Sequence, residues 1–161
     1  MNKTTETQKK FMKEAIDLSI ENSKSTNGGP FGCVIVKNDK IIAKASNAVT
    51  TSNDPTAHAE IQAIRKACQH LNSFQLTDCE IYSSCEPCPM CFGAIYWARP
   101  KNLFYANTKE DAANAGFDDQ FIYDELAKPK EERFIKMVKM NNTNAIEAFD
   151  NWRASTIITK Y

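Results

Sequence analysis

Apolar residues recur at two spacings in the first third of the chain, and the two spacings predict different elements. Across residues 7–25 they return every three to four positions, the period of an amphipathic helix that packs one face on a sheet. A polar, glycine-containing run at residues 27–30 ends that helix. Residues 31–36 and 41–45 are short apolar runs rich in β-branched side chains, with an Asn-Asp pair between them. These two runs predict a β-hairpin.

Helices and strands alternate over the next part of the chain. We expect a helix that starts near Asp54-Pro55 and ends near His70, a strand at residues 79–83, a helix that opens at Pro87 and ends at Arg99-Pro100, and a strand at residues 102–106. This alternation predicts helices on both faces of a sheet, with parallel pairing after the initial hairpin. Residues 134–140 predict a fifth, edge strand, and a last helix follows from Thr143. The predicted fold class is α/β, a three-layer α/β/α fold with a mixed five-stranded central sheet.

Length and composition narrow the class of protein. A chain of 161 residues with 42% hydrophobic content fits one domain that spans residues 1–161. Lys+Arg and Asp+Glu each number 20, so the formal net charge of +0 gives no general reason to expect a nucleic-acid partner. Residues 1–10 lack a signal-peptide pattern, and no apolar run reaches the length of about 18 residues that a membrane span needs. We therefore expect a cytoplasmic protein that does not enter a membrane.

Two of the six cysteines and one histidine form a candidate metal site. Without a secretion signal, reduced or metal-bound cysteines are expected rather than disulfides. Cys88 and Cys91 are three positions apart, so both sulfurs would lie on one face of a helix that begins at Pro87, and His58 would lie one turn into its own helix. An imidazole and two thiolates are good zinc ligands, and three protein ligands leave a fourth position open for water. We predict one catalytic Zn²⁺ per subunit, between two helix N-termini.

Glu60 follows His58 by two positions and is not needed as a ligand. It can share the site only if the metal lies beyond the N-terminal end of the helix, the direction in which helical side chains tilt. Zinc lowers the pKa of a bound water, and a neighbouring carboxylate can carry the proton. We therefore predict that Glu60 is the catalytic residue. The alternative is a closed structural site with Cys85 as fourth ligand, which would leave Glu60 without a purpose.

The segments that carry these residues, His58-Ala59-Glu60 and Pro87-Cys88-Pro89-Met90-Cys91, resemble the signature of the zinc-dependent cytidine deaminase superfamily. Within it, the chain from about Gly28 onward is similar to the bacterial guanine deaminases. The likeness rests on residues 29–32, 50–60, 84–91, 93–100 and 115–119 and on the terminal tyrosine, and it is weakest at residues 132–144. The resemblance implies a cytidine-deaminase-like fold and hydrolytic removal of the 2-amino group of guanine, giving xanthine and ammonia.

The resemblance also implies a pocket for the purine base. Asn47 matches an asparagine that reads a purine edge, and Asp119 matches an acidic residue that faces the ring N–H groups. The remaining matches are Phe31 and Trp97 as aromatic lining, Ala59 as a substrate-binding position, and Tyr161 as a carboxy-terminal residue that closes the pocket. In similar enzymes the final helix crosses to a partner subunit, which implies a homodimer, with the pocket shared if that segment is swapped.

The residues by themselves leave alternatives open. Phe31 and Trp97 could equally belong to the core, and Asn47 could be a turn residue. Asp118 and Asp119 could cap a helix, and Tyr161 could be a frayed end. For function, the alternatives are a deaminase of cytosine or guanosine, a tRNA adenosine deaminase, and a non-catalytic structural zinc module. Cys33, Cys68 and Cys79 lie in apolar settings and are predicted to be small core residues.

Overall fold

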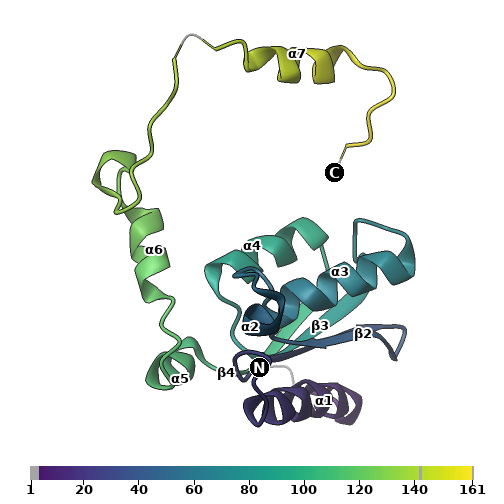
Figure 1. Ribbon diagram of the computed structural model, residues 1–161. Helices are drawn as coiled ribbons and strands as arrows, with labels where there is room; N and C mark the ends of the chain where they lie inside the picture. The colour runs from purple at the N-terminus through teal and green to yellow at the C-terminus, as the bar shows by residue number, and fades with distance from the viewer. Residues whose placement is uncertain (1–3, 142, 161) are drawn as a thin grey trace. The chain divides into compact units, whose positions relative to one another are not determined.

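The chain forms two compact units in the computed structural model, which describes residues 4–141 and 143–160 (Figure 1). The first unit is Met1–Gln120 and contains the whole sheet, and the second is Phe121–Tyr161. Among the described residues, no helix is both long and apolar enough to cross a membrane.

A four-stranded mixed sheet forms the centre of the first unit. Its strands are β1 (Gly32–Lys37), β2 (Lys40–Ser46), β3 (Cys79–Cys85) and β4 (Asn102–Asn107), in the order β2-β1-β3-β4. Strand β1 pairs antiparallel with both β2 and β3, and β4 pairs parallel with β3. Asn38 and Asp39 turn the hairpin with φ angles of 50° and 58°, which suit the twist of hairpin strands. The predicted hairpin and mixed sheet are confirmed, and parallel pairing begins only at β4.

Helices cover both faces of the sheet, as the three-layer prediction requires. The helices of this unit are α1 (Glu6–Ser23), α2 (Val49–Ser52), α3 (Ala59–Leu71), α4 (Pro89–Ala98) and α5 (Lys109–Asn114). Figure 1 shows α1 on one face of the sheet and α3 and α4 on the other. The two valines of β1 pack with α1, whereas Cys33 and Ile35 pack with α3 and α4, because successive side chains of a strand point to opposite faces. Strand β1 is therefore buried on both sides, which explains its continuous apolar sequence.

Helix α1 approaches β1 very closely at Gly32. A Cβ atom at this position would lie 2.3 Å from the carbonyl oxygen of Ala15 and 2.8 Å from Cβ of Leu18. Near its end, α1 also carries the buried Asn22, whose amide nitrogen donates to the carbonyl oxygens of Gly29 and Asn47 at 2.7 and 2.9 Å. Helix α1 thus fixes the loop before β1 to the residues that follow β2.

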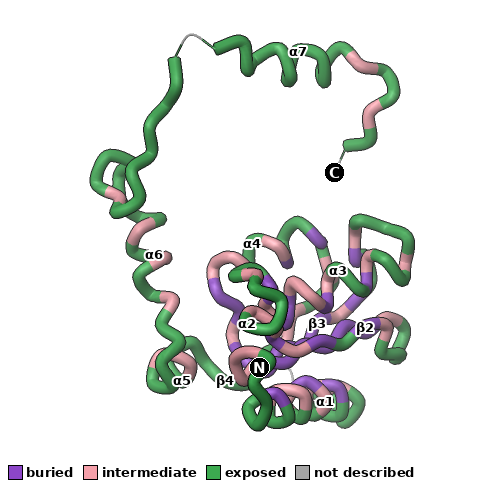
Figure 2. Tube along the Cα trace, in the orientation of Figure 1, coloured by how far each residue is buried: buried purple, intermediate pink, exposed green. Residues whose placement is uncertain are grey.

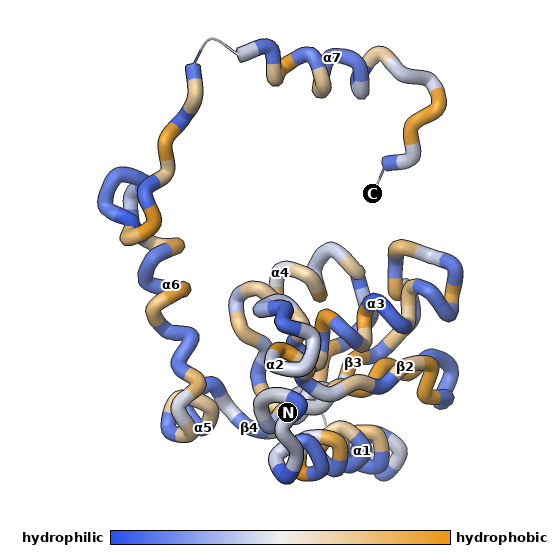
Figure 3. The backbone as a smooth tube through the Cα atoms, viewed as in Figure 1, coloured by the Kyte–Doolittle hydropathy of each residue, from blue (hydrophilic) through white to orange (hydrophobic). Residues whose placement is uncertain are grey.

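The second unit has helical segments but no core of its own among its described residues. It contains the rest of α6 (Gln120–Ala127), the short 3₁₀ helix η1 (Lys130–Glu132) and α7 (Ile146–Ala154). None of its described residues is buried, as the green and pink tube of Figure 2 shows, although apolar residues recur along it (Figure 3). The strongly exposed apolar side chains are Phe121, Leu126, Phe134, Ile135, Met137, Val138, Met140, Ile146, Phe149 and Ile157.

The prediction of a fifth strand at residues 134–140 is wrong. No described residue of this segment belongs to a strand, and β4 forms the edge of the sheet. A strand exists only through its hydrogen-bonded neighbour, and an apolar run in the sequence does not show that a neighbour is present. Helix α5, which was not predicted, begins with a capping box between Thr108 and Asp111. The predicted last helix is confirmed as α7, which begins at Ile146.

Candidate metal centre and active site

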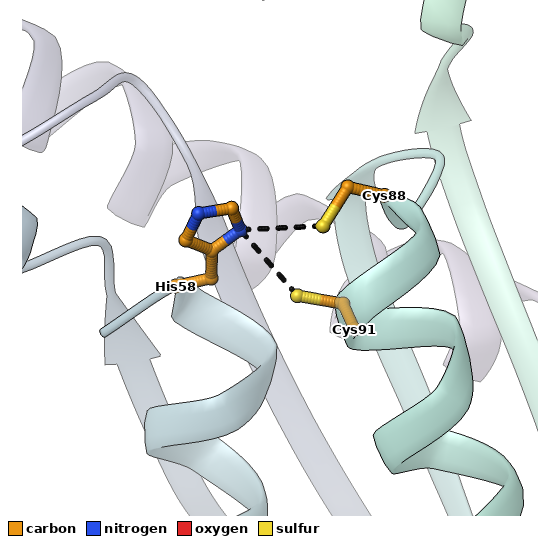
Figure 4. A group of neighbouring side chains, drawn as sticks. All are labelled: His58, Cys88 and Cys91. Atoms are coloured by element: carbon orange, nitrogen blue, oxygen red, sulfur yellow. Dashed lines mark hydrogen bonds between the residues drawn. The ribbon is translucent and has the colours of Figure 1, made fainter. Parts of the chain in front are cut away.

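Two helices begin at the residues that the sequence singles out. His58 is the N-cap of α3 and Cys88 is the N-cap of α4, and both have extended backbone angles. Neither side chain makes a capping hydrogen bond to its own helix. The side chains instead face each other, and Cys91 joins them from the first turn of α4 (Figure 4).

The local sequence explains where these helices start. Cys88 precedes Pro89, and the residue before a proline is biased towards extended backbone, so the helix begins at Pro89 and not at Pro87 as predicted. Asp54 does not cap α3: its Oδ1 accepts from the backbone nitrogen of Thr56 at 2.7 Å and forms a turn before His58. His58 therefore lies at the N-terminal end of α3 and not one turn inside the helix, as predicted. At this end the imidazole is closer to the position that a metal near Glu60 would occupy.

The three side chains are spaced as zinc ligands. Nδ1 of His58 lies 3.5 Å from Sγ of Cys88 and 3.5 Å from Sγ of Cys91, and all three ligand atoms lie within 4.8 Å of one another. Zinc–sulfur and zinc–nitrogen bonds of ordinary length at a tetrahedral angle would separate nitrogen and sulfur by about 3.6 Å. The donor set and spacing fit Zn²⁺, and three ligands leave one tetrahedral position for water.

The charges in the site favour a cation. A hydrogen bond from the Cys91 thiol and the nearby His58 ring lower the pKa of Cys88 to about 4, so one sulfur is a thiolate at neutral pH. The same hydrogen bond, burial and the negative charge of Glu60 raise the pKa of Cys91. Contact with Cys88 raises the pKa of His58, despite the opposing effect of its partial burial. A divalent ion would compete with protons for all three side chains.

Glu60 lies beside this cluster as the second residue of α3. Its carboxylate is 5% exposed, and burial raises its pKa. Oε1 accepts a hydrogen bond from the hydroxyl of Ser83 at 2.8 Å, and Oε2 lies 3.4 Å from Sγ of Cys91. Ser83 does not stand out in the sequence, although period-two alternation from Ile81 along β3 places it on the α3 side of the sheet.

The other cysteines do not belong to the cluster. Cys85 donates from its thiol to the carbonyl oxygen of Thr108 at 3.4 Å and is not among the candidate ligands of the described residues. The closed structural alternative with Cys85 as fourth ligand is therefore wrong. Cys33 and Cys79 are buried, Cys68 packs against the same core cluster, and all six cysteines are free.

Asn47 is buried next to the loop before β1, and its side-chain orientation is fixed. Its Oδ1 accepts from the backbone N–H groups of Gly29 at 3.2 Å and Val49 at 3.1 Å, so the oxygen and nitrogen positions are unambiguous. Gly28 is required beside it, because a Cβ there would lie 2.3 Å from Oδ1 of Asn47. Among the described residues, no acceptor pairs with the amide nitrogen, whereas the amide oxygen is engaged by these two backbone N–H groups.

Two candidate aromatic residues differ in their surroundings. Phe31 packs against the core, and its ring meets Phe117 edge to face with the ring centroids 5.0 Å apart. Trp97 is 64% exposed on α4, so the core alternative for Trp97 is wrong. Ala59 is fully buried at the first position of α3, directly after His58.

The two neighbouring aspartates separate into different roles. Asp118 accepts a hydrogen bond from the backbone nitrogen of Gln120 at 2.8 Å and so forms a turn immediately before α6. Asp119 is partly buried, which raises its pKa, and it lies close enough to Cys88 and His58 for their charges to act on it. Of the two aspartates, Asp119 is thus the one for which the charges of the metal-site residues are felt. Tyr161 lies outside the described residues.

The fold and the site define a zinc-binding α/β protein with an open ligand position. Residues 5–107 match the family described as the cytidine and deoxycytidylate deaminase zinc-binding region. This match spans more than half of the chain and includes all three ligands and Glu60. The chain belongs to this family, and His58, Cys88 and Cys91 form its zinc site.

The chain is similar both to guanine deaminases and to tRNA-specific adenosine deaminases. A guanine deaminase of Bacillus subtilis (strain 168) is 59% identical over 143 residues, which are 89% of this chain and 92% of that protein. The X-ray structure of guanine deaminase from Bacillus subtilis superposes with a TM-score of 0.93 at 54% identity and covers 100% of this chain and 99% of that one. A tRNA-specific adenosine deaminase of Aquifex aeolicus (strain VF5) is 46% identical over 77 residues, 48% of this chain and 51% of that protein.

A further solved structure contains a bound base. The crystal structure of NE0047 in complex with 2,6-diaminopurine has a TM-score of 0.64 and 34% identity, covering 68% of this chain and 61% of that chain. A protein with this fold and 34% identity to the chain thus binds a purine base.

Proposed function

We propose that the chain is a guanine deaminase, a hydrolase that converts guanine and water to xanthine and ammonia. The observation that carries the proposal is a set of three zinc ligands with a separate buried acid, Glu60, in contact with one of them. The 59% identity to the Bacillus subtilis guanine deaminase favours guanine as the base. A non-catalytic zinc module would have no use for a buried carboxylate beside an open coordination position.

Zinc held by His58, Cys88 and Cys91 would supply water with a pKa near neutrality, and hence hydroxide at physiological pH. The protein itself then has to move protons. Glu60 accepts the first proton that the attacking water loses and passes it to the ring nitrogen beside C2; it then accepts the remaining proton of the hydroxyl on C2 and delivers it to the departing amine. A water oxygen replaces the amine nitrogen on C2, and the nitrogen leaves as ammonia. Burial raises the pKa of Glu60, which suits a group that must both accept and donate protons.

The base would be held by a small number of polar groups and aromatic rings. Asn47 donates from its amide nitrogen to an acceptor on the purine edge, since its oxygen is already engaged by two backbone N–H groups. Asp119 accepts from the ring N–H groups of the base, and its position near Cys88 supports this role. The remaining residues proposed to line or close the pocket are Phe31, Ala59, Trp97 and Tyr161.

A homodimer is also part of the proposal, with the second unit of each chain packed on the other copy. The described residues of this unit expose many apolar side chains, and none of these residues is buried. Apolar burial within the unit therefore cannot offset the conformational entropy that the segment loses when it becomes ordered. Strand β4 ends the sheet and could accept an added strand from another chain. Light scattering after gel filtration should give twice the 18.1 kDa mass of one chain. A monomer at all concentrations would contradict this part.

The proposed location is the cytoplasm. All six cysteines are free, and two of them act as zinc ligands that oxidation would destroy. A reducing compartment preserves both the free thiols and the two cysteine ligands of zinc.

The second candidate is a tRNA adenosine deaminase, which the similarity to the Aquifex aeolicus protein favours. A tRNA substrate is held mainly through its phosphates, so its enzyme gains from an excess of basic residues. This chain has 20 basic and 20 acidic residues, which supports a small neutral substrate instead.

A panel of aminated bases tests the choice of substrate. Ammonia release should be measured with guanine, guanosine, cytosine, adenine and tRNA at equal enzyme concentration, with the Glu60→Gln protein as the blank. Guanine should be deaminated fastest. Rapid release from cytosine or tRNA, with none from guanine, would assign the site to a different substrate.

A further inference from the structure

Ser83 makes a buried hydrogen bond to the acid of the active site. Its hydroxyl donates to Oε1 of Glu60 at 2.8 Å, and the two residues are 2% and 5% exposed. Hydrogen bonds from a neutral donor to a carboxylate are stronger than those between neutral groups, and burial removes water as a competitor. This contact therefore restrains the Glu60 side chain more firmly than a surface hydrogen bond would.

Strand geometry places Ser83 and its neighbour Ser84 on opposite faces of the sheet. Cys79 and Ile81 of β3 pack in the cluster that includes α3 and α4, and Ser83 continues that alternation. Ser84 is equally buried at 2% exposure, but its hydroxyl oxygen accepts from the backbone nitrogen of Gly32 at 3.0 Å. Only one of these two adjacent serines touches Glu60.

The two oxygens of Glu60 have different surroundings. Oε2 lies 3.4 Å from Sγ of Cys91, whereas Oε1 faces Ser83. When Cys91 is a zinc ligand it is a thiolate and has no proton to donate. Ser83 is then the side chain, among those that the structure describes in contact with Glu60, that can still donate to it.

We propose that Ser83 is a positioning residue that anchors Oε1 of Glu60 and thereby directs Oε2 to the reacting atoms. A carboxylate that carries several protons in one turnover must keep one oxygen within hydrogen-bond reach of each partner, and a loss of alignment lowers the rate. This inference rests on the proposed deaminase function. It does not depend on the identity of the base.

Kinetics of Ser83→Ala and Ser83→Thr test the inference, with Ser84→Ala as the matched control from the same strand. The assay uses whichever base of the panel the wild-type protein deaminates fastest, so a wrong choice of guanine would not change the result. Ser83→Ala should lower kcat about 10- to 100-fold with KM and zinc content unchanged, because it removes a hydrogen bond to a charged group. Ser83→Thr retains the hydroxyl and should restore most of the turnover. Ser84→Ala should keep the wild-type kcat.

A double-mutant cycle separates positioning from a general structural role. In a Glu60→Gln background, Ser83→Ala should cause no further loss of the residual rate, because the group it positions is already disabled. Crystal structures give a second readout: the Glu60 side chain should leave its place against Cys91 in Ser83→Ala and keep it in Ser84→Ala. If Ser83→Ala does not fold, Ser83→Cys fills a similar volume with a weaker donor and should show the same selective loss of kcat.

Three outcomes would overturn the inference. Wild-type kcat in folded, zinc-loaded Ser83→Ala would show that the hydrogen bond does not matter for turnover. An equal loss in the Glu60→Gln background, or a Ser83→Thr protein as impaired as Ser83→Ala, would show that Ser83 serves only the packing of the core.

Discussion

Oε2 of Glu60 lies 3.4 Å from Sγ of Cys91, so the acid that we propose to carry protons is in direct contact with a zinc ligand. Both side chains come from the first turn of a helix, Glu60 from α3 and Cys91 from α4. The N-termini of two helices, where backbone N–H groups are unpaired and the helix dipoles are positive, thus meet at one site. This arrangement would favour the negative charge that develops in the proposed attack by hydroxide.

Loss of one thiolate should remove the metal. Cys88→Ser should weaken zinc binding by more than about 100-fold, and turnover should fall to background. This loss exceeds the usual effect of changing a residue that only hydrogen-bonds to a metal ligand. Zinc content after dialysis, measured by elemental analysis, checks this. Cys85→Ser is the matched control, because Cys85 is buried nearby but bonds to Thr108. If Cys85→Ser also lost its zinc, the assignment of three ligands would be wrong.

Zinc binding should release a defined number of protons. Cys88, with its pKa lowered to about 4 by the Cys91 thiol and His58, is already a thiolate at neutral pH, whereas the raised pKa of Cys91 keeps it protonated. Above the raised pKa of His58, zinc therefore displaces about one proton from the protein, and below that pKa it displaces a second from the ring. Ionisation of the bound water adds about one more proton above the pKa of that water, so zinc affinity should rise with pH and be lost as the pH falls.

Calorimetric titration of zinc in buffers of different ionisation enthalpy measures this proton release. At about pH 8 about two protons are expected, one from Cys91 and one from the bound water, and release of three would mean that Cys88 is a thiol before the metal binds.

Asn47→Asp should separate recognition of the base from support of the loop. Aspartate keeps an oxygen for the N–H groups of Gly29 and Val49, but it lacks the amide donors proposed to bind the purine. KM for guanine should rise about tenfold or more, while thermal stability and zinc content stay close to wild type. Asn47→Ala removes both functions and should also lower the stability. An unchanged KM in Asn47→Asp would remove this residue from the pocket.

Gly32→Ala should destabilise the fold, because the new Cβ would lie 2.3 Å from the carbonyl oxygen of Ala15. Overpacking of this kind costs about 1–3 kcal/mol of the free energy of unfolding. Gly93→Ala is the matched control: nothing lies within 4 Å of its Cβ position in α4, and alanine should stabilise the helix by up to about 1 kcal/mol. Urea unfolding of both proteins checks the difference, and equal stabilities would contradict the close contact between α1 and β1.

The sequence was sufficient to predict the parts of the site that depend on spacing. His58, Cys88 and Cys91 are a recognisable ligand set, and the expectation that Glu60 shares their site predicts a ligand cluster at the N-terminal end of α3, where the structure has it. The predicted helix starts are less accurate. Pro87 and Pro89 could each occupy the first position of α4, and only the extended backbone of Cys88 shows that the helix begins at Pro89.

Features that depend on partners far apart in the sequence were missed. The contact between Ser83 and Glu60 cannot be predicted from the sequence, because the two residues are 23 positions apart. Only the packing of β3 beside α3 brings the hydroxyl of Ser83 to the carboxylate of Glu60. The orientation of Asn47 depends in the same way on the backbone of Gly29, and the apolar run at residues 134–140 could not show whether a strand lies next to it.

The most direct test of the central claim is ammonia release from guanine by zinc-loaded wild-type and Glu60→Gln proteins. The wild type should release ammonia and form xanthine in equal amounts. Glu60→Gln should bind the same amount of zinc but lose at least about 100-fold in kcat, since glutamine preserves the shape of the side chain and cannot carry a proton. Near-normal turnover by Glu60→Gln with a full complement of zinc would contradict the proposed mechanism.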